Sequence, residues 1–437
     1  MTKYIMGHIQ MINLFLCFIC TPLAVLSLSS VPTWQQLSTM PNFSHEIPFA
    51  ANGASFSSRP EISDKPTLYR ERHGWCPYSE RIWLALEVLG VDYDTVYIDN
   101  IYGRPSWYFG DTPQMRWENG KIQSESMDLV REVDKKFRNS SLCLYPEAIE
   151  NQVLNKIQAF KKIFPSRARP SSRAAFLFRF DGEPLWKSEF DTVLKDTDTL
   201  LSETNGPFFC GSEFTAADIA WAPFLERYAA QLPCLHDGLD PKDDTKYPYL
   251  ASWYKAMDDT IPAYSCKVQG DASSWRKVLT MAGYGNAGSV PVVISERMED
   301  AGVRESLPLS ADEQEKQQNL WNLFIKDRPY LAASPSKEAA SVLIRNKDMI
   351  KVDIQKRSSS KLIQQNIPDE DDDLDIIMRA LATVLSEDYF DQDVIDHCKR
   401  INRVYDLAAY LDQRMCVPRD MNRLSAGCIK RLASIKL

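Results

Sequence analysis

The sequence predicts an α/β domain, then an all-α domain, then a further helical extension. Three observations indicate this order. Short strand and helix patterns bounded by turns fill residues 66–140, helical patterns with little strand signal fill 146–288, and helix-like segments return over 289–437. A chain of 437 residues is long enough for two or three domains, each with its own core.

Composition narrows the classes of partner. The net charge of −8 argues against nucleic acid as the main partner, because binding a phosphate backbone requires a basic face. Apart from one pair in the N-terminal apolar run, the 10 cysteines are scattered singly, without the spacing of a zinc site or the density of a small disulfide scaffold. We therefore expect no metal and mostly reduced, structural cysteines.

The first 65 residues divide into two segments. Residues 1–30 have the layout of a signal peptide, with Lys3 before an apolar run and serines at its end. The run is nearly long enough to span a membrane, but Asn13 and Pro22 favour a removable signal over a retained anchor. Residues 31–65 are rich in Ser, Pro, Asn and Ala, so we interpret them as a linker or as a plastid transit segment. The mature chain is then expected to have no stable membrane span.

The elements after residue 66 are short and follow one another in a recognisable order. "TLYRE" (67–71) has the composition of a strand, "PYSERIWLALEVLG" (77–90) is typical of a helix, and "DYDTVYID" (92–99) alternates like a second strand. Within residues 112–123 an Asn-Gly pair predicts a hairpin turn between two short strands, and a helix follows over 125–137. This β-α-β, β-β-α order is that of a thioredoxin-like domain.

The middle of the chain contains well-marked helices. Thr215 lies three places before Asp218, the spacing of a capping box at a helix start. "GYGNAG" (283–288) has the glycine spacing of a dinucleotide loop, but it follows a helix and precedes a strand-like segment. Because the loop requires the reverse context, we interpret these glycines as a helix stop and linker. The role of the extension after residue 288 is left open.

Cys76 lies at the predicted start of a helix. Pro77 has no amide hydrogen and a fixed φ, so it suits the first helical position and places Cys76 at the N-cap. There the sulfur faces unpaired amides and the positive end of the helix dipole, which favour the thiolate that nucleophilic chemistry needs. Arg72, His73 and Arg81 are near in sequence and could add positive potential.

Ser79 decides between two thiol chemistries. A dithiol oxidoreductase would have its resolving cysteine at this position, whereas a serine cannot form that disulfide. A mixed disulfide at Cys76 must then be resolved by an external thiol, for which glutathione is the obvious candidate. Several roles stay open at this point. Ser79 either bonds the sulfur or is structural, His73 is either a loop residue or a base, and Tyr78 either lines a pocket or is an exposed aromatic residue.

Together these motifs resemble those of a glutathione transferase over about residues 67–285. They are Cys-Pro-Tyr-Ser at 76–79, Thr112-Pro113 before a hairpin, Glu125-Ser126 opening a helix, and Thr215-x-x-Asp218 in a helical domain. A cysteine in place of the catalytic serine or tyrosine resembles the omega, lambda and dehydroascorbate-reductase branches. The phrases "TPQMRWENGK", "ESMDLVREVD", "SSWRKVLTMAGYGNAG" and "YDLAAYLDQRMCVPRDM" are similar to the iota class of photosynthetic organisms, which carries a long C-terminal extension.

The resemblance implies a glutathione transferase fold and roles for individual residues. Pro113 would be a cis-proline, and the backbone of Thr112 would pair with the cysteinyl part of glutathione. Glu125 and Ser126 would bind the γ-glutamyl carboxylate and ammonium, and an anion suits a helix N-terminus.

Three further positions belong to the implied glutathione site. Tyr78 and Ser79 would line it beside Cys76. A lysine that helps to hold the glycyl carboxylate in relatives of the cysteine type has no clear counterpart in "NIYGRPSWYFGD", where Arg104 is the candidate substitute.

The leading hypothesis is an enzyme with glutathione as co-substrate and no metal. Cys76 would attack a glutathione mixed disulfide, or a related oxidised or electrophilic substrate, and a second glutathione would release the product. Deglutathionylation or thioltransfer is favoured over conjugation, and reduction of dehydroascorbate or quinone-type adducts stays open. The alternative is a non-catalytic protein that binds glutathione or another ligand and presents its C-terminal helices to a partner. The resemblance implies a chloroplast location, whereas the signal-like start alone would also suit the secretory pathway.

Overall fold

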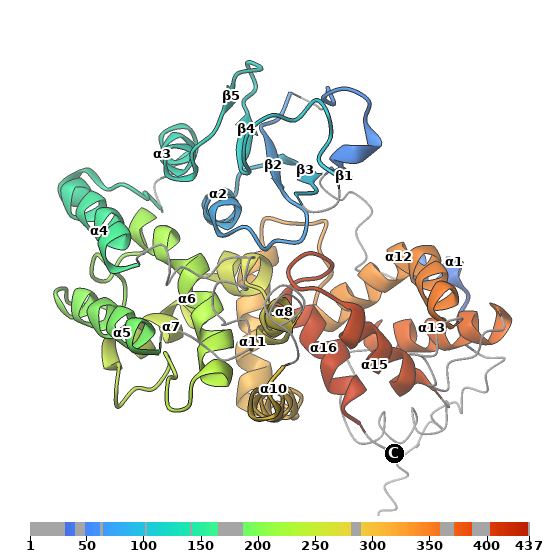
Figure 1. Ribbon diagram of the computed structural model, residues 1–437. Helices are drawn as coiled ribbons and strands as arrows, with labels where there is room; N and C mark the ends of the chain where they lie inside the picture. Colours follow the sequence, from blue (N-terminus) through green and yellow to red (C-terminus); the bar gives the residue numbers. More distant parts are fainter. Residues whose placement is uncertain are drawn as a thin grey trace, which may run out of the picture.

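The computed structural model describes residues 31–39, 49–61, 64–100, 103–139, 142–164, 187–280, 290–358, 371–386 and 403–435. They form an α/β region, a helical region that follows it, and a second helical region at the C-terminal end (Figure 1). The predicted fold class is therefore confirmed. The domain boundaries drawn at residues 140, 146 and 288 stay predictions.

The α/β region contains a five-stranded sheet of order β1-β3-β2-β4-β5. The strands are β1 (Ala50–Asn52), β2 (Thr67–Glu71), β3 (Asp94–Ile98), β4 (Gln114–Arg116) and β5 (Ile122–Gln123). β3 pairs in parallel with both β1 and β2, whereas β4 pairs antiparallel with β2 and with β5. The hairpin turns at Gly120, whose φ of 78° favours glycine. Four of the five strands were predicted, and β1 was not.

Both faces of β2 are buried. Leu68 packs on one face against α2 (Pro77–Val88) and α3 (Ser126–Phe137). Tyr69 packs on the other face with Trp107 and Tyr108, and the guanidinium of Arg59 lies 5.5 Å from its ring. Helix α2 therefore lies between the sheet and the helical region, so its N-terminus is fixed from both sides.

The first helical region packs around one long buried helix, α6. Its members are the short η3 (Glu147–Ile149), α4 (Glu150–Ile163), α5 (Lys187–Ser202), α6 (Ala216–Leu235), α7 (Pro248–Thr260), the π-helical η6 (Tyr264–Val268) and α8 (Ala272–Val278). The capping box at the start of α6 is confirmed: Thr215 accepts a bond from the Ala217 amide, and Asp218 accepts one of 2.9 Å from the Thr215 amide. Asp218 also accepts a bond from the indole of Trp253 on α7, so the cap joins two helices.

The extension forms a second packed helical region. Its helices are α10 (Val292–Glu305), α11 (Ala311–Ile325), α12 (Pro335–Ser358), α13 (Asp371–Ser386), α15 (Val404–Arg414) and α16 (Arg423–Ala433). Helices α12, α13, α15 and α16 share a core of their own. A second cluster joins the extension to the first helical region, where Trp321 and Phe324 of α11 pack with Cys266 of η6.

The segment predicted as a linker or transit segment contains regular structure. It includes α1 (Trp34–Ser38), β1 and the short 3-10 helix η2 (Gly53–Ser55). Figure 1 shows α1, in blue, beside α12 and α13 of the extension. The Trp34 indole donates a bond of 2.7 Å to Asp375, and Leu37 is buried in the same core. This segment therefore contacts both the sheet and the extension.

Two features of the sequence lie outside the described residues: the signal-like segment 1–30 and the glycine motif at 283–288. Within the described ranges, no helix is long and apolar enough to cross a membrane. In the same ranges, no group of three or more His, Cys, Asp or Glu side chains is placed to hold a metal ion.

Candidate functional site

Cys76 is the N-cap residue of α2, as predicted. Its backbone is extended, with φ −75° and ψ 111°, and Pro77 follows as the first helical residue. The Cys76 sulfur is half-buried and lies 3.6 Å from the carbonyl oxygen of Thr112. The side chain caps no helix amide, and the thiol lies in position to donate to the Thr112 carbonyl instead, so the predicted contact with the helix amides is not formed.

The peptide bond between Thr112 and Pro113 is cis, as the resemblance implies. It lies just before β4, and the Thr112 carbonyl lies next to the Cys76 sulfur. The Thr112 hydroxyl accepts a bond of 3.0 Å from Asn100. The start of α2 and the loop that carries Thr112, which are distant in sequence, thus meet at the sulfur.

Residues 72–75, between β2 and α2, are called the pre-cysteine loop below. The buried carboxylate of Glu71 accepts bonds of 2.7 Å from the His73 amide and 2.8 Å from the Trp75 amide. Burial raises the pKa of Glu71, and these amide bonds oppose the rise. The loop therefore turns around one carboxylate, which fixes the direction in which the chain enters α2.

Arg227 of α6 contacts the same loop from the helical region. Its Nη2 donates a bond of 3.1 Å to the Trp75 carbonyl, and its Nη1 pairs with Glu80 of α2 at 2.8 Å. Both side chains of this ion pair are 3% exposed. Nothing in the local sequence pattern pointed to Arg227, because the residues it contacts lie about 150 positions earlier.

Glu125 and Ser126 lie together at the start of α3, opposite α2. Glu125 is exposed and has φ +72°, a conformation that non-glycine residues rarely adopt. Ser126 is buried, and its hydroxyl lies 3.5 Å from Arg81, which also bonds the Ala220 carbonyl of α6 through two nitrogens. The unusual backbone conformation of Glu125 at the start of α3 motivates a functional interpretation of this residue.

Tyr78 and Ser79, adjacent residues of α2, differ in burial. Tyr78 is 39% exposed, with its ring edge-on to Phe224 and the Arg81 guanidinium 5.4 Å from the ring centre. Ser79 is buried, and its hydroxyl has no hydrogen-bond partner within the described part of the chain. Tyr78 therefore occupies a surface position two residues after Cys76, and its role toward a ligand stays a prediction.

Arg104 has partners within the protein. Its guanidinium donates 2.6 Å to the Gly110 carbonyl and 2.9 Å to Asn100, which in turn bonds Thr112. This chain of contacts connects Arg104 to the residue beside the Cys76 sulfur. Arg104 therefore stabilises the loop that carries Thr112.

His73 is held neutral in the pre-cysteine loop. Its Nδ1 accepts a bond of 2.9 Å from Arg419 of the extension, and its ring stacks on Trp75 with centroids 4.6 Å apart. Burial first, then the charge of Arg419, lowers the pKa of His73 to about 4. A group of this kind is a poor base near neutral pH, which favours the loop-residue interpretation. Arg419 was another residue that sequence reasoning missed.

Comparisons with known protein families match two parts of the chain. Residues 75–136 match the family model described as "Glutathione S-transferase, N-terminal domain", and residues 165–256 match the model for the C-terminal domain of the same family. The first match covers Cys76, the cis bond and the start of α3.

Individual relatives agree with these matches. "Glutathione S-transferase L2, chloroplastic" of Arabidopsis thaliana is 29% identical over 200 residues, which cover 44% of this chain and 62% of that protein. "Protein IN2-1 homolog B" of Oryza sativa is 31% identical over 169 residues, covering 37% and 64%. The chain thus spans less than two thirds of the length of these two relatives. A solved glutathione transferase, Omega 3C from Trametes versicolor, aligns at 19% identity with a TM-score of 0.41 over 52% of this chain and 94% of that one.

Proposed function

The chain belongs to the glutathione transferase superfamily, and we propose that it acts as a cysteine-type, glutathione-dependent thiol transferase with Cys76 as nucleophile. The observation that carries the proposal is the place of Cys76: a half-buried sulfur at the N-cap of α2, with a serine where a resolving cysteine would be. A thiol at a helix N-terminus suits nucleophilic attack. The iota class, with its long extension, is the branch that we propose.

The proposed reaction has two thiol exchanges. The Cys76 thiolate attacks the glutathionyl sulfur of a mixed disulfide, so a Cys76–glutathione disulfide forms and the substrate leaves as its thiolate. A second glutathione thiolate then attacks the glutathione sulfur of that disulfide, which releases oxidised glutathione and restores the Cys76 thiolate. Each step exchanges one disulfide for another, and no metal takes part.

Thr112, which contacts the sulfur, and the residues at the start of α3 support this assignment of glutathione. The Thr112 backbone lies 3.6 Å from the sulfur, in reach of the cysteinyl part of a bound tripeptide. Glu125 and Ser126, at the start of α3, would take the γ-glutamyl end, and Tyr78 would lie over the site from the surface of α2. Substrates with dehydroascorbate or quinone-type groups belong to the same proposal, since a cysteine nucleophile can form adducts with each.

We further propose that the protein works in a plastid. The signal-like start and the name of one relative, which ends in "chloroplastic", support this location. Imaging of a full-length fluorescent fusion in a photosynthetic cell tests this, and signal confined to the secretory pathway would contradict it.

The test of function is turnover of a glutathionylated peptide with reduced glutathione, before and after Cys76→Ser. We expect activity to fall by about a thousandfold or more, because the serine hydroxyl is a far weaker nucleophile. Cys143→Ser, at another half-buried cysteine, is the matched control and should keep wild-type activity. Full activity in Cys76→Ser would overturn the assignment. Normal glutathione binding without turnover of any substrate class would favour a binding protein instead.

A further inference from the structure

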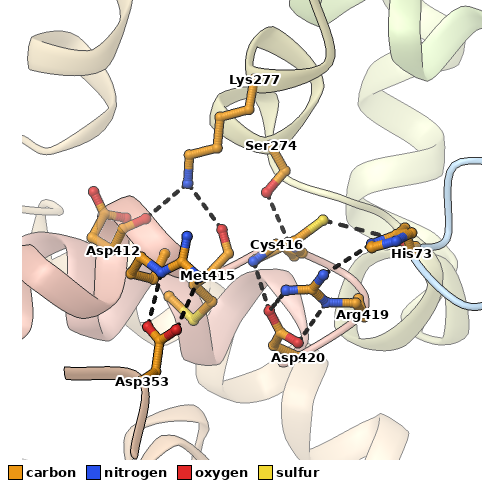
Figure 2. A network of polar contacts seen from close by, with 11 residues as sticks. His73, Ser274, Lys277, Asp353, Asp412, Met415, Cys416, Arg419 and Asp420 are labelled. Carbon is orange, nitrogen blue, oxygen red and sulfur yellow. Dashed lines mark hydrogen bonds and ion pairs between the residues drawn. The ribbon is translucent and has the colours of Figure 1, made fainter. Parts of the chain in front are cut away.

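One loop of the extension lies directly against the pre-cysteine loop. Residues 415–421, between α15 and α16, are called the 415–421 loop below. Figure 2 shows its Arg419 and Cys416 pointing toward His73. Arg419 Nη1 donates a bond of 2.9 Å to His73 Nδ1, and the Cys416 sulfur lies 3.8 Å from the His73 carbonyl. Pro418 packs on Gly74, where a Cβ would come within 3.2 Å of its ring.

The 415–421 loop is itself fixed by several bonds. Asp420 accepts bonds of 2.6 Å from both Nε and Nη2 of Arg419, and one of 2.9 Å from the Cys416 amide. The Val417 amide donates to Ser274 of α8 at 2.8 Å. A paired, planar guanidinium loses little freedom when it makes a third contact, so Arg419 is already oriented toward His73.

Lys277 adds a second connection between α8 and this part of the extension. Its ammonium donates 2.8 Å to the Asp412 carbonyl and 2.9 Å to the Met415 carbonyl, at the end of α15 (Figure 2). Together with the Ser274 bond, this places the 415–421 loop by contacts that come from the transferase region itself.

The extension also contacts the far end of α2. Arg328, just after α11, donates a bond of 2.8 Å to the Glu87 carbonyl and lies 3.3 Å from the Glu87 carboxylate. An arginine suits a helix C-terminus, where carbonyls lack partners and the dipole is negative. The helix that carries Cys76 is thus contacted by the extension near both ends.

We propose that the C-terminal extension positions the pre-cysteine loop for catalysis, and that Arg419 is its positioning residue. The inference rests on the proposed function, since it assumes that Cys76 reacts. Two arginines from different parts of the chain contact the loop: Arg227 of α6 bonds the Trp75 carbonyl, and Arg419 of the extension bonds the His73 ring. The residue after this loop is Cys76, so motion of the loop also moves the Cys76 sulfur. A misplacement of about 1 Å can cost about a hundredfold in rate.

The bond from Arg419 to His73 is present over the whole working range of pH. His73 is faced by Arg419, Arg72, Asp99 and Asp420, and burial together with the two guanidinium groups keeps its pKa near 4. The ring therefore stays neutral, and its Nδ1 remains an acceptor for Arg419. The contact between the extension and the loop is therefore the same across this pH range.

The experiment uses the full chain with three variants. Arg419→Ala removes the contact to His73, Arg419→Lys keeps a charge but loses the planar pairing with Asp420, and Arg414→Ala is the matched control. Arg414 lies at the end of α15, is exposed, and pairs with Asp353 of α12 instead of the pre-cysteine loop. Full-chain variants are preferred to a deletion, because removing the extension would expose Ala263 and Cys266, which pack against Trp321 of α11.

We expect Arg419→Ala to lower kcat about tenfold while the KM for glutathione changes less than about twofold. The reason is that the proposed glutathione contacts at 112–126 are untouched. Arg419→Lys should recover part of kcat, and Arg414→Ala should match wild type. The His73 ring resonances, followed by NMR, should titrate at higher pH in Arg419→Ala, which a merely structural loss elsewhere would not produce.

Two outcomes are distinguishable. Wild-type kcat in Arg419→Ala, with an inactive Cys76→Ser, would overturn the positioning role and leave the proposed function intact.

Full activity in Cys76→Ser would overturn the proposed function, and the rate of Cys76 alkylation by iodoacetamide would then test positioning by itself. An alkylation rate in Arg419→Ala equal to that of wild type would refute the inference, whereas an altered rate would support it. Thermal unfolding of each variant checks that it is folded.

Discussion

The carboxylate of Glu80 and the guanidinium of Arg227 form a buried ion pair 2.8 Å long beneath the first turn of α2. The same arginine bonds the carbonyl of Trp75, so the pair joins the helix start to α6. The position of the candidate nucleophile therefore depends on the contact between the α/β region and the helical region.

We expect Arg227→Ala to destabilise the protein by about 3–5 kcal/mol, because it leaves the Glu80 charge buried without its partner. The measurement is the free energy of unfolding in urea. Lys65→Ala is the matched control: its pair with Asp92 is exposed, so the loss should stay below about 1 kcal/mol. Equal losses in the two variants would contradict the assignment of a buried pair.

Native thiol labelling should distinguish Cys76 from the buried cysteines. Its sulfur is half-buried, whereas burial raises the pKa of Cys266 to about 12 and that of Cys416 to about 11. We expect iodoacetamide at pH 7.5 to label Cys76 early and to leave Cys266 and Cys416 unmodified, as read by peptide mass spectrometry. Unfolded protein, in which all cysteines react, is the control. Early labelling of Cys416 would mean that the 415–421 loop opens readily.

Two substitutions at Glu125 should separate the effect of its positive φ on stability from its effect on glutathione binding. Glu125→Gly relieves the φ of +72°, so stability should stay within about 1 kcal/mol of wild type or rise. The KM for glutathione should rise about tenfold as a charged contact is lost. Glu125→Gln keeps the backbone conformation and should raise KM alone. If neither variant changes KM, Glu125 does not take the γ-glutamyl end.

His73 should make stability depend on acid pH. Its pKa is lowered from 6.5 to about 4 in the folded protein, so the unfolded chain binds the proton first. The contribution to stability is complete above pH 6.5 and is lost as pH falls toward 4, with a total of about 3 kcal/mol. His73→Asn, whose amide oxygen can replace Nδ1 as acceptor, should flatten this part of the profile. Urea unfolding at a series of pH values measures it, and an unchanged slope would contradict the prediction.

Local chemistry predicted much of the fold. Pro77 marked the start of α2, the Asn-Gly turn marked the β4–β5 hairpin, and Thr215 with Asp218 marked the start of α6. These signals work because a turn or a cap is determined by a few adjacent residues. The strand β1 escaped notice, because three residues of low strand propensity are held by pairing with β3, more than 40 positions away.

Some residues of the candidate site could likewise be located from the sequence, and others could not. Cys76 and Ser126 could be located from sequence because each occupies a helix start. Arg227 and Arg419 could not be assigned a role, although Arg419 lies in a phrase quoted for the resemblance, since their contacts to the pre-cysteine loop span 152 and 346 positions. The roles of Tyr78 and Ser79 toward glutathione remain predictions.

The bond between Trp34 and Asp375 determines when α1 can pack during synthesis of the chain. Its two residues are 341 positions apart, so α1 must wait for its partner helices while the rest of the chain is translated. At about 5–20 residues per second, that delay is on the order of half a minute. During it, Trp34 and Leu37 have no core to enter and are open to chaperones or import receptors. A reporter fused after residue 65 would keep them in that unpartnered state permanently, so only a full-length fusion tests the destination of the folded protein.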